Sequence, residues 1–163
     1  MPDSQSKTLA ATHEITTAVI KRARPQVGLF QCLIVSANAF RREMLVRSAS
    51  EGGWEAVVCS TTAQALECLS RMFLQLAVVD LDHQDPADFT YLLEKLAPSS
   101  SLLLIVCGNE GDVQEEVWVR QLGAWLYLPG VVDASNLTLL CNEARHLAQR
   151  LNPVEKTNGV HAH

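Results

Sequence analysis

Four aspartates gather in one short stretch, VVDLDHQDPAD, that follows an apolar run. They are Asp80, Asp82, Asp85 and Asp88, and His83 lies among them. Carboxylates in such a cluster can hold a divalent cation, and a pair of them at the mouth of a sheet is used by metal-dependent phosphatases and nucleases. One interpretation is therefore a Mg2+-dependent hydrolase that uses Asp80 and Asp82.

Some of these acids, and two others later in the chain, are explained more simply by helix starts than by a metal site. Asp85 and Asp88 precede an apolar stripe of helical period, where acids in the first turn face the positive end of the helix dipole. Glu110 and Asp112 stand in the same way before a later helical segment. Because no second acidic cluster follows the first or the fourth apolar run, we do not expect an enzyme.

The cysteines show no pattern of a metal or redox site. Their number is odd, they form no C-x-x-C pair, and most lie in apolar runs such as CLIV and VVC. We expect small buried core residues at all of them. The five are Cys32, Cys59, Cys68, Cys107 and Cys141.

Phosphate-binding loops are also missing from the sequence. The turn after the first apolar run, SANAFRREM, has no glycine, and neither G-x-G-x-x-G nor G-x-x-x-x-G-K-[ST] occurs anywhere. Arg41 and Arg42 in this turn are able to meet an anion. We expect them instead to be solvated on the outer face of a helix.

Length and charge exclude several classes of protein. The chain has 163 residues, of which 48% are hydrophobic and 19% charged, as in one globular domain. Residues 29–152 hold eight lysines and arginines against fifteen acids, so we expect no nucleic-acid partner. No apolar run reaches the roughly 20 residues of a membrane span, and the first residues lack the apolar region of a secretory signal. We expect a cytoplasmic protein without a membrane partner.

The chain alternates between two hydrophobic periods, which predicts the elements that position these side chains. Helical patterns occupy about 38–51, 61–73, 87–97, 112–122 and 134–151, and Phe40, Phe73 and Leu151 are among the residues expected on their buried sides. Other segments are apolar at nearly every position, which indicates strands that are covered on both faces. Strands of this kind predict a parallel, doubly wound sheet. The predicted strands are 30–35, 55–59, 75–79, 102–107 and 125–128.

Two segments lie outside this pattern. Residues 1–28 predict an N-terminal arm that is partly helical, because the period between about 8 and 22 is blurred by poor helix formers. Residues 153–163 are polar and aperiodic, which predicts a disordered tail.

The order of the elements, the turn VVDLDHQDP and the stretch GAWLYL before the last helix resemble the receiver domain of bacterial response regulators, the phosphoacceptor module of two-component signalling. The resemblance covers about 29–152. It implies a flavodoxin-like (βα)5 fold, in which helices cover both faces of a five-stranded parallel sheet of order 2-1-3-4-5. It also places the functional site at the carboxyl ends of the strands.

The resemblance makes Asp80 the phosphoacceptor equivalent. In that family, acids after the first strand hold the Mg2+ that neutralises the transferring phosphoryl group. Here Ser36 and Ala37 stand at those positions, so Asp80 and Asp82 would have to hold the ion alone. We expect the Ser36 hydroxyl at best to bond a water of the metal's shell.

Three further positions follow from the resemblance. Cys107 replaces the family's Ser or Thr hydroxyl after the fourth strand, and Gly130 replaces the lysine after the fifth. Tyr127 matches the aromatic that changes position in active receivers, and plain core packing in the fifth strand is the alternative.

The sequence therefore predicts a degenerate receiver, or pseudo-receiver, that works through protein contacts without efficient phosphorylation and needs no cofactor. The expected partner is another signalling protein, such as a histidine kinase or an output protein, and a homodimer is an alternative. The expected interface carries Trp118, Leu122 and Trp125. The competing functions are a single-domain response regulator phosphorylated on Asp80, which would need Mg2+, and the Mg2+-dependent hydrolase.

Overall fold

Five strands and five helices alternate along the described part of the chain. The computed structural model describes residues 30–82, 84–130 and 133–153. The predicted N-terminal arm, His83 and all but the first residue of the predicted tail lie outside the described residues. The strands are β1 (Gln31–Val35), β2 (Glu55–Cys59), β3 (Leu76–Asp80), β4 (Leu103–Gly108) and β5 (Leu126–Pro129). The helices are α2 (Ala39–Glu51), α3 (Thr62–Arg71), α4 (Pro86–Leu96), α5 (Val113–Gln121) and α6 (Ala134–Leu151).

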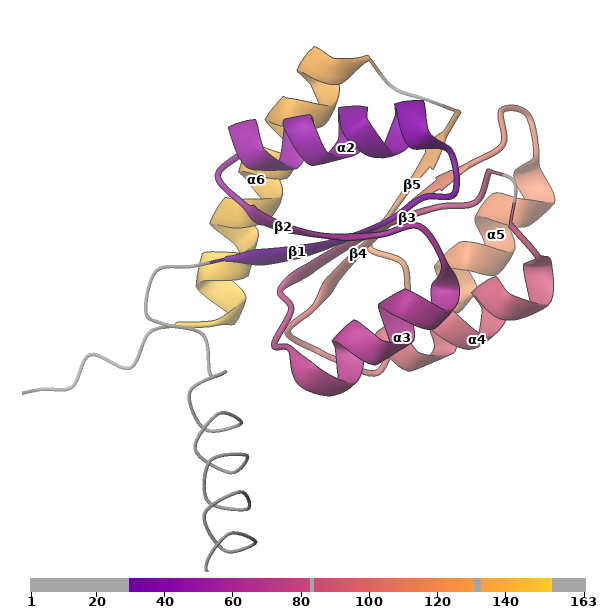
Figure 1. Cartoon of the computed structure of the whole chain (residues 1–163), viewed down its shortest axis with the longest axis horizontal. Coiled ribbons are helices and arrows are strands. Elements are labelled where there is room, and N and C mark those ends of the chain that lie inside the picture. Colours follow the sequence, from indigo (N-terminus) through magenta and orange to yellow (C-terminus); the bar gives the residue numbers. More distant parts are fainter. Residues whose placement is uncertain (1–29, 83, 131–132, 154–163) are drawn as a thin grey trace, which may run out of the picture.

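The strands form a parallel sheet of order β2-β1-β3-β4-β5, which confirms the predicted flavodoxin-like topology. Helices α2 and α6 cover one face, and α3, α4 and α5 cover the other, so the molecule has three layers (Figure 1). Val35 pairs with Val79, and Asp80 pairs with Cys107. The carboxyl ends of β1, β3 and β4 therefore meet at one edge of the sheet.

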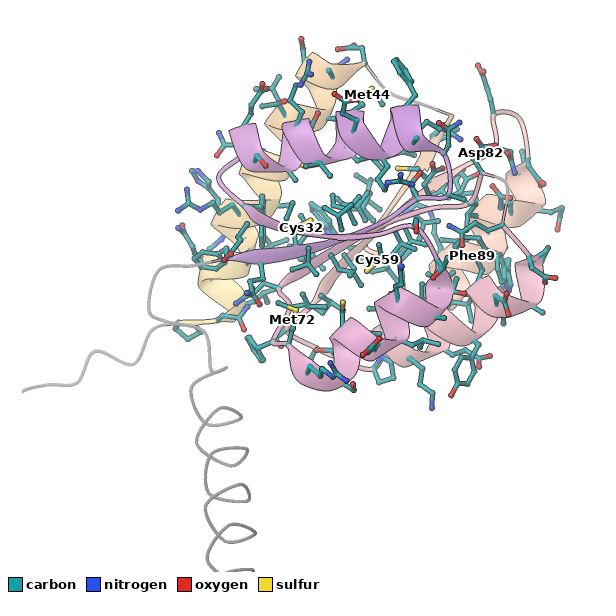
Figure 2. The ribbon with its side chains drawn as sticks, viewed as in Figure 1. Cys32, Met44, Cys59, Met72, Asp82 and Phe89 are labelled. Atoms are coloured by element: carbon teal, nitrogen blue, oxygen red, sulfur yellow. The ribbon has the colours of Figure 1, made fainter. Side chains whose placement is uncertain are left out.

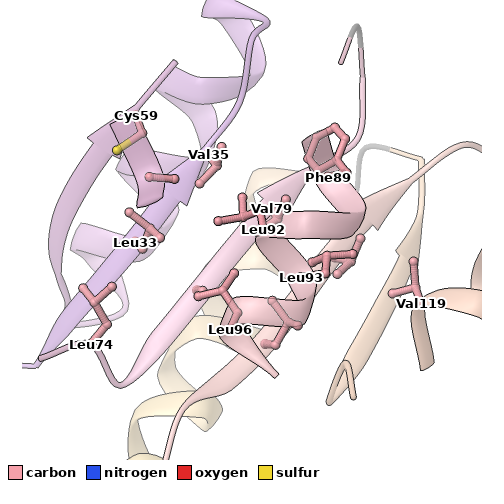
Figure 3. Packing of buried hydrophobic residues seen from close by; sticks show 14 of the residues in the cluster. Leu33, Val35, Cys59, Leu74, Val79, Phe89, Leu92, Leu93, Leu96 and Val119 are labelled. Carbon is pink, nitrogen blue, oxygen red and sulfur yellow. The ribbon is translucent and has the colours of Figure 1, made fainter. Parts of the chain in front are cut away.

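A hydrophobic core fills each of the two interfaces between the sheet and its helices (Figure 2). On the side of α3 to α5, Leu33 and Val79 of the sheet pack with Leu92 and Leu93 of α4 (Figure 3). Because helices cover both faces, the central strands must be apolar at nearly every position, which is the pattern seen in the sequence.

Side-chain caps fix where the helices begin. Asn38 accepts the backbone N–H groups of Phe40 and Arg41 at the start of α2. Asp85 and Asp112 cap α4 and α5 in the same manner, which confirms the prediction that these acids belong to helix starts. None of the helices in the described ranges is long and apolar enough to cross a bilayer.

Three hydrophobic side chains that were predicted to be buried are exposed. Phe40 is 77% exposed because it lies far round α2 from the side that carries the buried Leu45 and Ala49. Phe73 is 45% exposed because α3 ends at Arg71, which leaves Phe73 in the extended link to β3. Leu151 is 43% exposed because it is the last residue of α6.

All five cysteines are free thiols. Four are buried, as predicted, and Cys68 on α3 is partly exposed. Cys32, Cys107 and Cys141 lie in the core beneath α2 and α6, whereas Cys59 and Cys68 lie on the opposite side of the sheet.

Candidate functional site

The carboxyl ends of β1 and β3 bring Ser36 and Asp80 together in the interior. Both side chains are buried, with Asp80 1% exposed. The Ser36 hydroxyl donates a hydrogen bond of 2.8 Å to Asp80 Oδ2. Ser36 thus bonds the carboxylate itself, because adjacent parallel strands end at the same level. Its expected bond to a metal-bound water stays a prediction.

A guanidinium group bridges the two carboxylates of the acidic turn. Arg41 Nη1 lies 3.2 Å from Asp80 Oδ1 and 3.1 Å from Asp82 Oδ2, and the Arg41 side chain is only 14% exposed. The expectation that Arg41 is solvated on an outer helix face is therefore wrong. The first turn of α2 lies over the edge of the sheet, so the Arg41 side chain reaches the two carboxylates rather than water.

The amino end of α2 is tied to both strands that end beneath it. Asn38 Nδ2 donates to Asp82 Oδ2 at 3.2 Å, while Asn38 Oδ1 caps the helix. Arg42 Nη1 donates to the backbone carbonyl of Ser36 at 2.9 Å, so this arginine also departs from the expected solvated position. These bonds hold α2 in the place from which Arg41 reaches Asp80.

Burial dominates the electrostatics of Asp80. Burial raises the pKa of this carboxyl above its ordinary value, and the Asp82 charge adds to the rise. The Ser36 hydroxyl, the backbone N–H of Asp82 and the Arg41 guanidinium oppose it. The charged carboxylate is therefore stabilised by protein groups on both oxygens, since Asp82 N–H donates to Oδ1 at 3.2 Å.

The donor set does not fit a Mg2+ site. Mg2+ takes oxygen ligands in octahedral geometry, and Asp80 and Asp82 are the carboxylates available here. The oxygens that would ligate the ion already contact the Arg41 guanidinium. Among the described residues, no group of three or more histidines, cysteines, aspartates or glutamates is placed to hold a metal ion.

The other predicted pocket positions add no cation or strong donor. Cys107 is paired with Asp80 in the sheet, and burial raises the pKa of its thiol to about 12, with the Asp80 charge contributing. It is a neutral thiol, which is a weak hydrogen-bond donor. Gly130 donates its backbone N–H to the Gly108 carbonyl at 3.0 Å and has no side chain to offer, and Ala37 is exposed.

Tyr127 is part of a second polar cluster at the end of β4. Its ring lies in the core, and its hydroxyl donates to Glu115 Oε1 at 2.7 Å. Glu115 also accepts the backbone N–H of Asn109 at 2.7 Å. Burial, together with Glu115, raises the pKa of the Tyr127 hydroxyl. A side chain at Gly108 would collide with the Tyr127 ring and the Glu115 carboxylate, so glycine at this position allows the inward placement.

The residues expected at an interface occupy different environments. Trp118 and Leu122 are only partly exposed and pack against the core beneath α5, whereas Trp125 is 38% exposed. The apolar side chains that α5 presents outward are instead Val113 and Val117. Trp118 and Leu122 pack against this core because their positions flank the buried Val119 around the axis of α5.

One feature of the sequence could have indicated that Arg41 and Arg42 contact other parts of the protein rather than solvent. Both lie in the first turn of α2, which has no acid, and cations there face the positive end of the helix dipole. Such a placement indicates that carboxylates from elsewhere in the fold compensate the charge. The contacts of Asn38 with Asp82 and of Glu115 with Tyr127 gave no comparable signal, because they join segments that are distant in the sequence.

No protein-family model and no curated protein matches this sequence, whereas many solved structures share its fold. A response regulator receiver domain protein from Methanospirillum hungatei JF-1 is 20% identical, with a TM-score of 0.66 over 76% of this chain and 99% of that chain. A receiver domain protein from Clostridium thermocellum is 17% identical, with a TM-score of 0.63 over 76% of this chain and 100% of that one. The signal receiver domain of a putative Luxo repressor protein from Vibrio parahaemolyticus is 18% identical, with a TM-score of 0.65 over 75% of this chain and 94% of that chain.

Proposed function

We propose that this chain is a receiver-like signal-transduction module that acts through protein contacts and is not efficiently phosphorylated. The fold is that of receiver domains, and Asp80 stands at the carboxyl end of β3. The observation that carries the proposal is the bridge from Arg41 to both Asp80 and Asp82. This bridge supplies internally the positive charge that a metal ion would otherwise bring.

Phosphoryl transfer to a carboxylate needs a free oxygen for attack and cations that neutralise the transferring group. In this site Asp80 Oδ2 accepts from Ser36, and Oδ1 contacts Arg41 and the Asp82 N–H. Mg2+ would have to displace a partly buried guanidinium from two carboxylates before it could bind. Neither Cys107 nor Gly130 supplies the donor or the cation that would compensate.

The same contacts oppose the hydrolase alternative, because a hydrolase would use Asp80 and Asp82 as its metal ligands. We therefore infer no enzymatic activity and no cofactor. The partner is another signalling protein, such as a histidine kinase or an output protein, with a homodimer as the alternative. The site of action that fits this role is the cytoplasm.

A Mg2+ titration tests the proposal at the site that carries it. In 15N-labelled full-length protein, we expect the amide signals of Ser36 and Asp82 to show no saturable shift through the millimolar range. The Arg41→Ala variant frees both carboxylates and is expected to gain Mg2+ affinity, whereas Arg47→Ala, on the exposed side of the same helix, behaves as the wild type. Saturable binding to the wild type with the affinity of Arg41→Ala would contradict the proposal.

A further inference from the structure

Two thiols touch beneath α3. The Sγ atoms of Cys59 and Cys68 are 3.7 Å apart. Cys59 is the last residue of β2, and Cys68 lies in the second turn of α3, the next element of the chain. The pair lies apart from the other three cysteines, which belong to the core on the opposite face of the sheet.

The two thiols differ in their access to solvent, and this difference determines which of them reacts first. Cys68 is partly exposed, so it is the member of the pair that a dissolved oxidant can approach. Cys59 is 1% exposed, and burial, with Cys68 adding, raises the pKa of its thiol to about 12. Cys68 is thus the thiol that an external reagent meets first, and Cys59 is the neutral thiol held against it.

We propose that Cys59 and Cys68 form a redox modification site, in which a peroxide converts the two thiols into a reversible disulfide. In the first step the Cys68 sulfur attacks the peroxide, the O–O bond breaks, and hydrogen peroxide yields the Cys68 sulfenic acid and one water. In the second step the Cys59 sulfur attacks the Cys68 sulfur, the S–O bond breaks, and the hydroxyl leaves with the Cys59 proton as a second water. The thiol pair is oxidised by two electrons, and the peroxide is reduced.

The geometry requires a small adjustment. The sulfurs must approach from 3.7 Å to the S–S bond length of about 2.05 Å, which side-chain rotation and a slight movement of α3 can supply. The movement falls on α3 because Cys59 is fixed in β2, which pairs with β1 along its whole length.

The pair is linked to the candidate site through the backbone. The Cys59 carbonyl accepts the N–H of Ser36 at 3.1 Å, and the Ser36 hydroxyl donates to Asp80. A disulfide at the end of β2 is therefore expected to shift the Ser36 amide signal. The inference does not depend on whether Asp80 is phosphorylated.

Peptide mapping of the full-length protein tests this site. Trypsin is expected to release residues 48–71 as one peptide, which contains Cys59 and Cys68 and no other cysteine. After reduction, denaturation and alkylation, the peptide should carry two alkyl groups. After treatment with hydrogen peroxide it should carry none and be lighter than the unalkylated dithiol by two hydrogen atoms, and a dithiol reductant should restore both alkylation sites.

Single variants separate the internal disulfide from simple oxidation. In Cys59→Ala, the Cys68 sulfenic acid has no internal partner and should proceed to higher oxides that the reductant does not reverse. In Cys68→Ala, Cys59 should stay alkylatable after peroxide because it is buried. The inference is overturned if peptide 48–71 of the peroxide-treated wild type still takes two alkyl groups, or if Cys68 is oxidised without a link to Cys59, and these wild-type measurements need no variant to fold.

Discussion

The bridge made by Arg41 determines what the carboxylates of the acidic turn can do. A single guanidinium contacts one fully buried and one partly buried carboxylate, and Asn38 and Arg42 hold the helix that carries it. Removal of the guanidinium leaves both carboxylates without a compensating charge. The resulting loss in the free energy of unfolding is larger than the net stabilisation that the intact ion pair provides.

Truncation of the bridge should therefore destabilise the fold. We expect Arg41→Ala to lower the free energy of unfolding by about 3 kcal/mol, because Asp80 and Asp82 then repel each other without a cation between them. Arg47→Ala is the matched control on the same helix: its side chain is 67% exposed and pairs with Glu43, so its cost should stay below about 1 kcal/mol. Urea denaturation followed by circular dichroism measures both, and equal losses for the two variants would contradict the structural role of Arg41.

The location of Asp80 was predictable from the sequence, but its partners were not. The alternation of apolar runs and helical stripes places Asp80 at the end of the third strand, and the fold confirms this position. The contact with Arg41 depends on where the first turn of α2 lies relative to β3, 39 residues further along the chain. Hydrophobic periodicity carries no information on that distance.

At the scale of elements, the connection from β4 to α5 is fixed by one acidic side chain. Glu115 accepts from the Tyr127 hydroxyl on β5 and from the Asn109 backbone at the end of β4. Its own N–H donates to the Asp112 cap. Three segments are thereby joined at one carboxylate, which holds the Tyr127 ring inward in the space left by Gly108.

Loss of the Tyr127 hydroxyl should loosen this connection. We expect Tyr127→Phe to lower the free energy of unfolding by about 1.5 kcal/mol, because a hydrogen bond to a charged acceptor is lost. Tyr91→Phe is the control, since Tyr91 on α4 is 51% exposed, and it should change stability by less than about 0.5 kcal/mol. Thermal unfolding of the two variants gives the comparison, and an unchanged Tyr127→Phe would show that ring packing alone holds the residue.

The strands and helices themselves were predicted to within one or two residues, because both faces of the sheet impose an apolar pattern on the sequence. The misplaced side chains lie where an element ends. Phe73 and Leu151 continue an apolar stripe past the region that the sheet can cover, whereas Phe40 lies on the outer side of the first turn of α2. Helical period alone did not identify either case.

At the scale of the whole molecule, the fold and the function rest on different residues. Solved receiver domains at 17 to 20% identity share the architecture, since it depends on the pattern of apolar positions rather than on particular side chains. A fold of this kind supports several functions, so the function must be argued from the site. Here the site combines an aspartate at the end of β3 with an arginine that neutralises it.

The structure shows where several of the acids that give the domain its negative charge are located. Two of its fifteen acids, Asp80 and Asp82, are held by Arg41 at the edge where the strands end. Others, such as Asp85 and Asp112, cap helices. These four acids thus have local structural roles that need no metal ion.

The most direct measurement is the intact mass of the full-length protein after incubation with Mg2+ and a small phosphodonor such as acetyl phosphate. Asp80→Asn, which keeps the shape of the side chain and removes the nucleophile, is the matched control. If the Arg41 bridge closes the site, the mass of the wild type stays unchanged and equals its untreated value. If the wild type gains one phosphoryl group that Asp80→Asn does not gain, the chain is a phosphorylatable regulator and the Arg41 bridge does not close the site.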